Sequence, residues 1–570
     1  MKVSKYPTRE KVQEKKLEGL KEYGELMQQL LFHRGIRTSG DAKAFLNHDY
    51  DSHTHNPFLL KDMEKAVKRI LCAIDKKEKI IIYSDYDCDG IPGGVVLHDF
   101  FKKIGYENVK NHIPHRHEDG YGFHISAVEE FAKDNVKLIV TVDCGITDVE
   151  TVARANELGM DVIITDHHLT NGKLPYAHAI LDPKQKGDKY PYKEISGAGV
   201  AFKLVQGLIE KGDFKIKEGW EKWLLDMVGL ATIADMVELR GENRAFAHYG
   251  LKVLRKSPRV GLMKLCRKIK VNQSQITEDD IGFMIAPRIN AASRMDLPYD
   301  AFKLLVTDDE IKADELSTYL NKINDERKGI VAGIVKEIKK RITGLSELKE
   351  VIVMGNPNWR PAFLGLAANS IVEEYDRPVF LWGRESGDVL KGSCRSDGSV
   401  NLVNMMEMVK GAFIAFGGHA YSGGFSITNE NIHTLEQTLS ESYEEAKKHH
   451  EDNGEEMFID KSLDIDDVSW DTYKTIEQLA PFGIGNPKPL FLFNDIEMHQ
   501  VSHFGKEKNH LKLEFKKSDG KVISSIAFFK NSKSFDKSLE KGEKINLVAT
   551  MEKSMFRNFP ELRLRIVDVV

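Results

Sequence analysis

The sequence predicts an α/β protein: two α/β domains joined by a long helix and followed by a small C-terminal β-barrel. Three observations lead to this prediction. From about residue 60, short apolar runs alternate with stretches of helical periodicity, as in parallel strands connected by helices. A proline-free segment with helical spacing covers residues 307–342. After about residue 455, short alternating strands and turns dominate, which is typical of a small barrel.

Composition excludes several classes of protein. A chain of 570 residues is long enough for three or four domains, and its 41% hydrophobic and 30% charged residues are ordinary for a globular protein. No apolar run approaches the roughly 20 residues of a membrane span, and the N-terminus lacks a signal-peptide core. Five scattered cysteines without a CxxC motif fit reduced thiols. We therefore expect a cytoplasmic protein without membrane association.

The first domain is predicted from three continuous, β-branched runs. They cover residues 79–85 (KIIIYSD), 136–145 (VKLIVTVDCG) and 159–168 (GMDVIITDHH). Runs of this kind are typical of parallel strands that are buried on both faces. Each run ends in an aspartate or in Asp-His-His, and the first continues into DYDCDG.

The later elements follow in order. Residues 307–342 predict one long helix, or two abutting helices, that starts in a capping box of Thr307 and Glu310. VIVMG and PVFLWG predict strands of a second α/β region, which closes in the glycine-rich stretch 416–425. A charged helix is expected near 429–453. HLKLEF, VISSIAFF, KINLVATM and ELRLRIVDV then predict strands of the barrel.

The charged ends of the first three runs predict a metal centre. Because the carboxyl ends of parallel strands line one crevice, seven side chains converge there if the strands are neighbours: Asp85, Asp87, Asp89, Asp143, Asp166, His167 and His168. So many carboxylates repel one another unless cations neutralise them. Carboxylates with imidazole suit Mn²⁺ or Mg²⁺. Two such ions about 3.5–4 Å apart would stabilise the attacking and leaving oxygens of a phosphoryl displacement.

Each motif alone also has a plainer interpretation. A DxDxDG stretch is often a calcium loop or an exposed acidic turn, and a His-His pair usually lies on the surface or in the core. Only their joint occurrence at consecutive strand ends favours the metal centre. The histidine-rich stretch 111–117 (NHIPHRH) could form a second metal site, but no pair of carboxylates frames it, so a connecting segment is favoured.

The motifs resemble a known family. SDYDCDG, TVDCG, ITDHH and GLATIADMVELRGENR resemble, in this order, the four motifs of the DHH phosphoesterases, and most closely the single-strand-specific exonucleases among them. GSCRS and FGGHAYSGGF resemble the DHHA1 domain, and LAPFGIGNPKPLF the beginning of an OB-fold. The resemblance implies these parts: an N-terminal helical segment (1–45), a DHH catalytic domain (46–305), a connecting helix (306–345), a DHHA1 domain (346–450) and an OB-fold (455–570).

The resemblance also implies roles for individual residues. Asp85, Asp87, Asp143, His167 and Asp235 are the expected metal ligands, and Asp235 is identified by the resemblance alone. Asp89 and Asp166 either bind metal or orient a ligand. His168 is expected beside the scissile phosphate, where it acts in catalysis with Asp143 and His167. At residue 83 many relatives carry a histidine and this chain carries Tyr83; no expected ligand is lost, so an active enzyme is predicted.

Phosphate-binding positions follow in the same way. In APRINAASRM the expected grips on backbone phosphate are Arg288, Asn290 and Arg294, because guanidinium groups match phosphate oxygens. In the second domain the residues that resemble a pocket for the substrate end are Arg395, Ser396, Gly417, Gly418 and His419. Glycine lets backbone N–H groups approach a phosphate closely.

The function implied is that of a metal-dependent exonuclease. It would degrade single-stranded DNA from 5′ to 3′ with two Mn²⁺ or Mg²⁺ ions, release 5′-mononucleotides and act in DNA repair and recombination. The expected partners are single-stranded DNA, a helicase and a single-strand-binding protein, and the chain is expected to be a monomer. One alternative is a DHH phosphodiesterase for short oligoribonucleotides or cyclic dinucleotides. The other is an inactive DHH scaffold of a replication complex.

Overall fold

The structure is a computed structural model, which describes residues 6–9, 12–170, 172–384, 387–449, 457–505, 508–535, 537–555 and 559–570. The chain divides into two compact units. The α/β unit comprises Asn56–Asp235 and Tyr249–Gly454, and the barrel unit comprises Met1–His55, Met236–His248 and Glu455–Val570. The N-terminal segment therefore groups with the C-terminal barrel and not with the first sheet.

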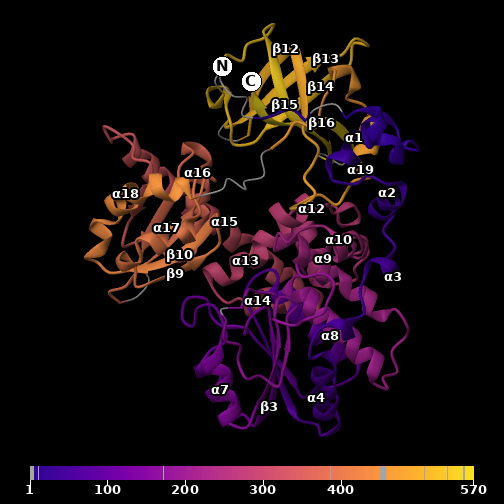
Figure 1. Cartoon of the computed structure of the whole chain (residues 1–570), viewed down its shortest axis with the longest axis vertical. Coiled ribbons are helices and arrows are strands. Elements are labelled where there is room, and N and C mark those ends of the chain that lie inside the picture. Colours follow the sequence, from indigo (N-terminus) through magenta and orange to yellow (C-terminus); the bar gives the residue numbers. More distant parts are fainter. Residues whose placement is uncertain are drawn as a thin grey trace. The chain divides into compact units, whose positions relative to one another are not determined.

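The first sheet of the α/β unit has five parallel strands in the order β2-β1-β3-β4-β5. Its strands are β1 (Lys79–Ser84), β2 (Val109–His112), β3 (Val136–Val142), β4 (Asp161–Thr165) and β5 (Ala179–Leu181). Helices cover both faces, with α7 on one side and α4 and α8 on the other (Figure 1). The helices of this layer are α4 (Met63–Asp75), α5 (Gly90–Lys103), α6 (Ile125–Lys133), α7 (Val149–Glu157) and α8 (Gly197–Lys211).

The register of this sheet brings the ends of the three predicted strands level. Ser84 pairs with Val142, and Val142 pairs with Thr165. The ladder continues one residue further, because the backbone N–H of Asp85 donates to Val142 O at 3.1 Å and that of Asp143 donates to Thr165 O at 2.9 Å. The prediction that the three runs are neighbouring strands is confirmed, and the residues after them start from the same edge.

A helical region follows the first sheet and ends in one long helix. Its helices are α9 (Leu225–Ala234), α10 (Gly241–Leu254), α11 (Val260–Lys268), α12 (Glu278–Asp280), a π-helix (Ile281–Ile285), α13 (Ala286–Met295), α14 (Tyr299–Val306) and α15 (Glu310–Ile342). The long helix α15 is continuous. Its N-cap is Asp309, whose carboxylate accepts from the N–H groups of Ile311 and Lys312, so the expected start at Thr307 is wrong. The Thr307 hydroxyl instead accepts from the N–H of Asp309.

The second sheet is mixed, with the order β6-β7-β8-β10-β9. Its strands are β6 (Ile352–Gly355), β7 (Val379–Gly383), β8 (Leu390–Arg395), β9 (Ala415–Gly418) and β10 (Ser422–Ile427), and its helices are α16 (Pro361–Tyr375), α17 (Leu402–Met408) and α18 (Leu435–Lys448). Two apolar clusters flank it, one with α15 and α16 and one with α17 and α18. The strands predicted at VIVMG and PVFLWG are confirmed; the charged helix is confirmed over α18, and residues 450–456 lie outside the described residues.

The barrel unit is a closed five-stranded sheet. Its strands follow the order β12-β13-β14-β16-β15, and β15 pairs back with β12. They are β12 (Phe491–Phe504), β13 (His510–Lys516), β14 (Val522–Ala527), β15 (Lys544–Ser554) and β16 (Glu561–Val569), with a short β11 (Lys461–Ser462) beside β12. The helices α1 (Glu25–His33), α2 (Ser39–Leu46), α3 (Tyr50–His53) and α19 (Trp470–Glu477) complete the unit.

One apolar core holds the barrel and the N-terminal helices together. Leu30 and Leu31 of α1 belong to the same buried cluster as Phe491, Phe493 and other barrel residues. The predicted fold class, with two α/β domains, a long helix and a C-terminal barrel, is confirmed. None of the helices in the described part of the chain combines the length and the apolar character of a membrane span.

Candidate metal centre and phosphate pocket

The predicted acidic and histidine side chains meet at the carboxyl edge of the first sheet. Three sets have ligand atoms within 4.8 Å of one another: Asp143 with His167 and His168, Asp89 with His167 and Asp235, and Asp85 with Asp87 and Asp143. The Nε2 atom of His167 lies 3.1 Å from Oδ1 of Asp143 and 3.7 Å from Oδ2 of Asp235. Because Asp143 and His167 each belong to two sets, the three sets form one continuous cluster.

The N-terminus of α8 holds the carboxylate of Asp89, which is one member of this cluster. Its two carboxylate oxygens accept from the backbone N–H groups of Gly197 at 2.6 Å and Ala198 at 2.8 Å, as anions do at helix N-termini. Glycine is required at the first of these positions, since a Cβ on Gly197 would lie 2.6 Å from Cβ of Asp143. Asp143 itself has a φ of +62°, a left-handed conformation that aspartate tolerates better than most residues.

Asp166 serves as a support for the histidines. Its Oδ2 accepts from the N–H of Ile146 at 3.0 Å, and its Oδ1 accepts from the N–H of His167 at 2.7 Å and from Nδ1 of His168 at 2.8 Å. Asp166 belongs to none of the three sets found among the described residues. Both of its oxygens are thus engaged in holding the Asp-His-His turn.

The carboxylates carry the electrostatic signature of a site built for cations. Burial, followed by the charge of Asp87, raises the pKa of Asp89 to about 7. Burial, followed by the charges of Asp89 and Asp87, raises the pKa of Asp235 to about 9. The same causes, burial first, hold the pKa values of Asp85 and Asp143 well above their usual range. Without positive charge the site therefore retains protons, which a divalent cation would displace.

The two histidines differ in charge. Burial, reinforced by the positive charge of His168, lowers the pKa of His167 to about 3, so its imidazole is neutral, as a metal ligand must be. Burial opposes a charge on His168, but the hydrogen bond to Asp166 and the charges of Asp166, Asp235 and Asp89 together outweigh it and raise the pKa of His168 to about 9. One imidazole is thus available to a metal and the other is a cation beside it.

The donor set fits divalent cations that prefer oxygen. Oδ1 of Asp85 is buried and has no hydrogen-bond partner among the described residues. Because buried polar atoms are normally paired, this oxygen is available to bind a cation. Oδ1 of Asp87 accepts from the N–H groups of Asp89 and Gly90, which leaves its other oxygen for a ligand. Several carboxylates with one neutral imidazole form a donor set that suits Mn²⁺ or Mg²⁺.

A pocket of about 240 Å³ opens directly onto these carboxylates. Its lining includes Asp85, Tyr86, Asp87, Arg116, Tyr121, Asp143, His168, Asp235, Asn290 and Arg294. The structure therefore brings two of the predicted phosphate grips, Asn290 and Arg294, to the metal cluster. Nη1 of Arg294 donates to Ala362 O at 2.6 Å. Burial and the charges of neighbouring arginines, Arg116 first among them, lower the pKa of Arg294 to about 9.

Arg288 is not part of this lining. It is buried, and its guanidinium donates to Met284 O at 2.6 Å and to Oδ1 of Asn321 at 3.0 Å. Two residues of the lining, Arg116 and Tyr121, were not predicted from the sequence. The guanidinium of Arg116 stacks on the ring of Tyr86 at 4.8 Å. The signal that could have identified them is the stretch RHEDGYG, in which Gly120 and Gly122 adopt positive φ values and turn the loop toward the site.

The predicted substrate-end residues lie at one end of the second sheet, where β8 and β9 end and β10 begins. Arg395 pairs with Ser422, Gly418 with Gly423 and Gly417 with Gly424. The Ser396 hydroxyl donates to Val400 O, and the N–H of His419 donates to Ser422 O. A second pocket of about 470 Å³ joins this sheet to the loop of Arg116 and Tyr121. Its lining comprises Tyr86, Arg116, His117, Tyr121, Pro361, Ala362, Lys391, Gly392, Ser393, Ala415, Phe416, Gly424, Phe425 and Ser426. None of the five predicted substrate-end residues is in that lining.

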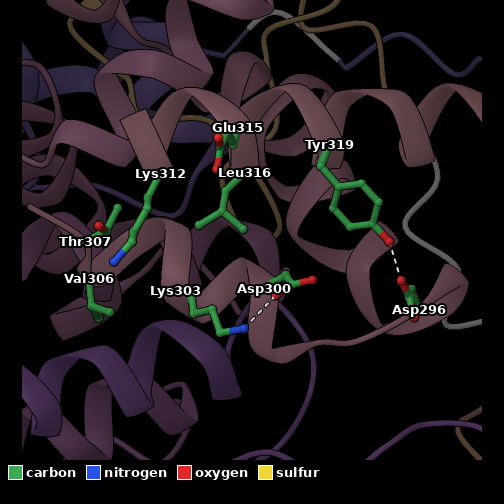
Figure 2. A pocket seen from close by; sticks show the side chains of 9 residues that line it. All are labelled: Asp296, Asp300, Lys303, Val306, Thr307, Lys312, Glu315, Leu316 and Tyr319. Carbon is green, nitrogen blue, oxygen red and sulfur yellow. Dashed lines mark hydrogen bonds and ion pairs between the residues drawn. The ribbon is translucent and has the colours of Figure 1, made fainter. Parts of the chain in front are cut away.

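A larger cavity, of about 770 Å³, lies between α14 and α15 and contains none of the predicted site residues (Figure 2). Two of its acidic side chains have partners within the lining, because Lys303 pairs with Asp300 at 3.0 Å and the Tyr319 hydroxyl donates to Asp296. Size alone therefore does not identify the functional site. The stretch 111–117, considered as a second metal site, contributes to no metal-binding set within the described residues.

Three family models match successive parts of the chain. Family models match residues 79–232 (DHH family, N-terminal domain), 348–445 (DHHA1 domain) and 459–568 (RecJ OB domain). The single-stranded-DNA-specific exonuclease RecJ of Bacillus subtilis is 33% identical over 95% of this chain and 67% of its own length. That of Haemophilus influenzae is 32% identical over 90% of this chain and 91% of its own length.

Solved structures give the same result for the fold. RecJ from Thermus thermophilus in complex with Mn²⁺ aligns with a TM-score of 0.82 and 25% identity, over 99% of this chain and 79% of that one. Another structure, of exonuclease RecJ bound to manganese, covers 68% of this chain and 95% of its own with a TM-score of 0.58 and 30% identity. The chain therefore belongs to the RecJ family of single-stranded-DNA-specific exonucleases.

Proposed function

We propose that this chain hydrolyses single-stranded DNA from its 5′ end, by a two-metal mechanism, and releases 5′-mononucleotides. The observation that carries the proposal is the small pocket in which an acidic cluster built for cations faces Asn290, Arg294 and Arg116. A phosphodiester is an anion that must come close to metal ions. The carboxylates of this pocket could bind the metal ions, and Arg116, Asn290 and Arg294 could bind the phosphate. Within a nuclease family, this combination supports phosphodiester hydrolysis in the pocket.

The metal ligands would divide into two overlapping sets. One ion would be held by Asp85, Asp87 and Asp143, and the other by Asp89, His167 and Asp235 with Asp143 nearby. When bound, such ions lower the pKa of a coordinated water and neutralise charge on the phosphate. The chain keeps His167 neutral for this purpose, and it keeps Asp143 in place by its backbone bond to Thr165.

His168 would act on the substrate directly. Its Nδ1–H donates to Asp166, which fixes the ring, so that the Nε2–H of the cationic imidazole is free to donate to a phosphate oxygen. A positioned donor of this kind stabilises the charge that builds up on the phosphate in the transition state and can supply a proton to the departing oxygen. Arg294 and Asn290 would hold the neighbouring phosphate oxygens.

The barrel unit would provide a further binding surface for the single-stranded DNA. The rings of Phe504, His510 and Phe528 lie with centroids 5.1 to 5.8 Å apart at the ends of β12, β13 and β14. Arg565 stacks on Phe528 at 4.1 Å, and Phe529 is 81% exposed beside them. OB-folds bind oligonucleotides on this side of the barrel, and exposed rings stack on bases without regard to sequence. These rings support a long substrate over a dinucleotide, which disfavours the short-oligonucleotide alternative.

The cellular setting is proposed from family membership. We infer that the enzyme works in the cytoplasm in DNA repair and recombination, as a monomer, on strands exposed by a helicase and covered by a single-strand-binding protein. The inactive-scaffold alternative is disfavoured because every carboxylate and imidazole of the cluster is retained.

The test uses single strands labelled at the 5′ or the 3′ end, incubated with Mn²⁺, Mg²⁺ or a chelator. We expect immediate release of a labelled mononucleotide from the 5′-labelled strand, late release from the 3′-labelled strand, and no reaction with chelator. Immediate release from the 3′-labelled strand would refute the polarity, and activity in chelator would refute the metal mechanism. A dinucleotide cleaved faster than a long strand would favour the alternative.

A further inference from the structure

Tyr83 lies on β1 only two residues before Asp85, yet its side chain packs into the apolar cluster and away from the metal cluster. It lies on β1 on the same face as Ile81, within the apolar cluster formed with α6 and α7, and it is fully buried. Its ring stacks on His112 at 5.1 Å and meets Phe123 edge-on at 4.9 Å. Its hydroxyl donates to Gly122 O at 3.0 Å. Tyr83 therefore contacts a loop and not a metal ligand.

That loop is anchored by three bonds from the layer beneath it. Besides the Tyr83 hydroxyl, Oδ2 of Asp148 accepts from the N–H of Phe123 at 2.9 Å, and the Thr151 hydroxyl donates to Phe123 O at 2.8 Å. Gly122 has a φ of +105°, and a Cβ there would come within 3.2 Å of the Asp148 carboxylate. The backbone at Gly122 and Phe123 is thus fixed to β1 and α7.

One residue earlier, the same loop presents Tyr121 to the site. The Tyr121 hydroxyl lies 3.3 Å from Nδ1 of His168 and 3.4 Å from Asp143 O. Tyr121 also lines both the 240 Å³ and the 470 Å³ pockets. The position of its phenol depends on the backbone at Gly122, because only one peptide unit separates the anchored carbonyl from the residue that reaches His168.

We propose that Tyr83 is a positioning residue for hydrolysis: its hydroxyl holds the Gly122 carbonyl and thereby sets Tyr121 against His168. The inference rests on the proposed function, since it concerns the geometry around His168 during phosphodiester hydrolysis. It assigns Tyr83 no role in metal binding. A displacement of Tyr121 by a fraction of an ångström changes how His168 meets the phosphate, and misplacement of this size acts on kcat.

The decisive variant is Tyr83→Phe, which removes the hydroxyl and keeps the ring. We expect kcat on single-stranded DNA to fall about tenfold, with KM and the Mn²⁺ affinity from calorimetry within about twofold of the unsubstituted chain. The matched control is Tyr106→Phe. Tyr106 likewise donates its hydroxyl to backbone carbonyls, those of Ala73 and Glu78, but away from the site, and its loss should leave kcat unchanged.

A double-mutant cycle with Tyr121→Phe tests the route of the effect. If Tyr83 acts through Tyr121, the double variant loses no more activity than Tyr121→Phe alone. Additive losses, an unchanged kcat in Tyr83→Phe, or a loss of Mn²⁺ affinity would each overturn the proposal. If Tyr83→Phe does not fold, Thr151→Val removes the neighbouring anchor, and a normal kcat in that variant overturns it instead. An unsubstituted chain that fails to cleave would count against the proposed function and not against Tyr83.

Discussion

Replacing Asp143 by asparagine should stabilise the metal-free protein while it destroys the enzyme. The ligand atoms of Asp85, Asp87 and Asp143 lie within 4.8 Å of one another. At that separation, two ionised carboxylates repel by about 3.5 kcal/mol at an effective dielectric constant of 20. Protons retained by the buried cluster relieve part of this repulsion, so we expect Asp143→Asn to add about 1–3 kcal/mol at pH 8. For a unit as large as the α/β unit, the melting temperature should rise by about 1–4 °C.

The raised pKa values determine whether the metal-free protein becomes more or less stable as pH rises. The folded metal-free site binds more protons than the unfolded chain, so its stability falls as pH rises from about 4 through the folded values of about 7 for Asp89 and about 9 for Asp235. The gain from Asp143→Asn should therefore be larger at pH 8.5 than at pH 6. Asparagine is preferable to alanine here because it tolerates the φ of +62°.

The assay is thermal unfolding with chelator and with Mn²⁺, together with nuclease rates. In the unsubstituted chain Mn²⁺ should raise the melting temperature, and in Asp143→Asn this effect should vanish and hydrolysis should fall on the order of 10³-fold. Asp213→Asn, which makes the same charge change at an exposed position, is the control. Retained stabilisation by Mn²⁺, or a lower melting temperature in chelator at pH 8.5, would refute the reasoning.

Three further substitutions test other parts of the site. His168→Gln should lower kcat by about 10²–10⁴-fold with Mn²⁺ affinity nearly unchanged, and a large loss of affinity in calorimetry would make His168 a ligand instead. Gly197→Ala places a Cβ 2.6 Å from that of Asp143, so Mn²⁺ affinity should fall about tenfold, whereas Gly333→Ala in open space on α15 should be neutral or slightly stabilising. Arg294→Gln should raise KM about tenfold and reduce the salt dependence of strand binding by about one unit of slope; an unchanged slope would remove Arg294 from the phosphate path.

The sheet and its metal cluster could be predicted because both depend on local pattern and a general rule. Continuous apolar runs identify buried parallel strands, and the rule that ligands bind at strand carboxyl ends places Asp85, Asp143 and His167 together. Asp235 has no such signal. It follows the apolar helix α9, where nothing in the spacing distinguishes it, and only the resemblance pointed to it.

Other features of the site and the fold depend on long-range geometry and could not be predicted from the sequence pattern. Arg116 and Tyr121 reach the site because two glycines bend a loop, and Arg288 is turned toward Met284 and Asn321, although its motif resembles a phosphate grip. Strand β12 was not predicted. Its alternation is broken by irregularities after Phe493 and after Met498, which shift the side chains between faces and hide the period of two.

The shared core of α1, α2 and the barrel has a consequence for biosynthesis. The helix that carries Leu30 and Leu31 is synthesised before Asn56–Asp235 and Tyr249–Gly454, and the strands that cover it are made only after them. At about 5–20 residues per second the delay is tens of seconds. During that time the nascent chain displays an apolar helical surface without its cover, and a chaperone that shields such surfaces should bind there first. A synonymous slowing of translation within the last strands would lengthen this exposed interval and lower the yield of folded enzyme.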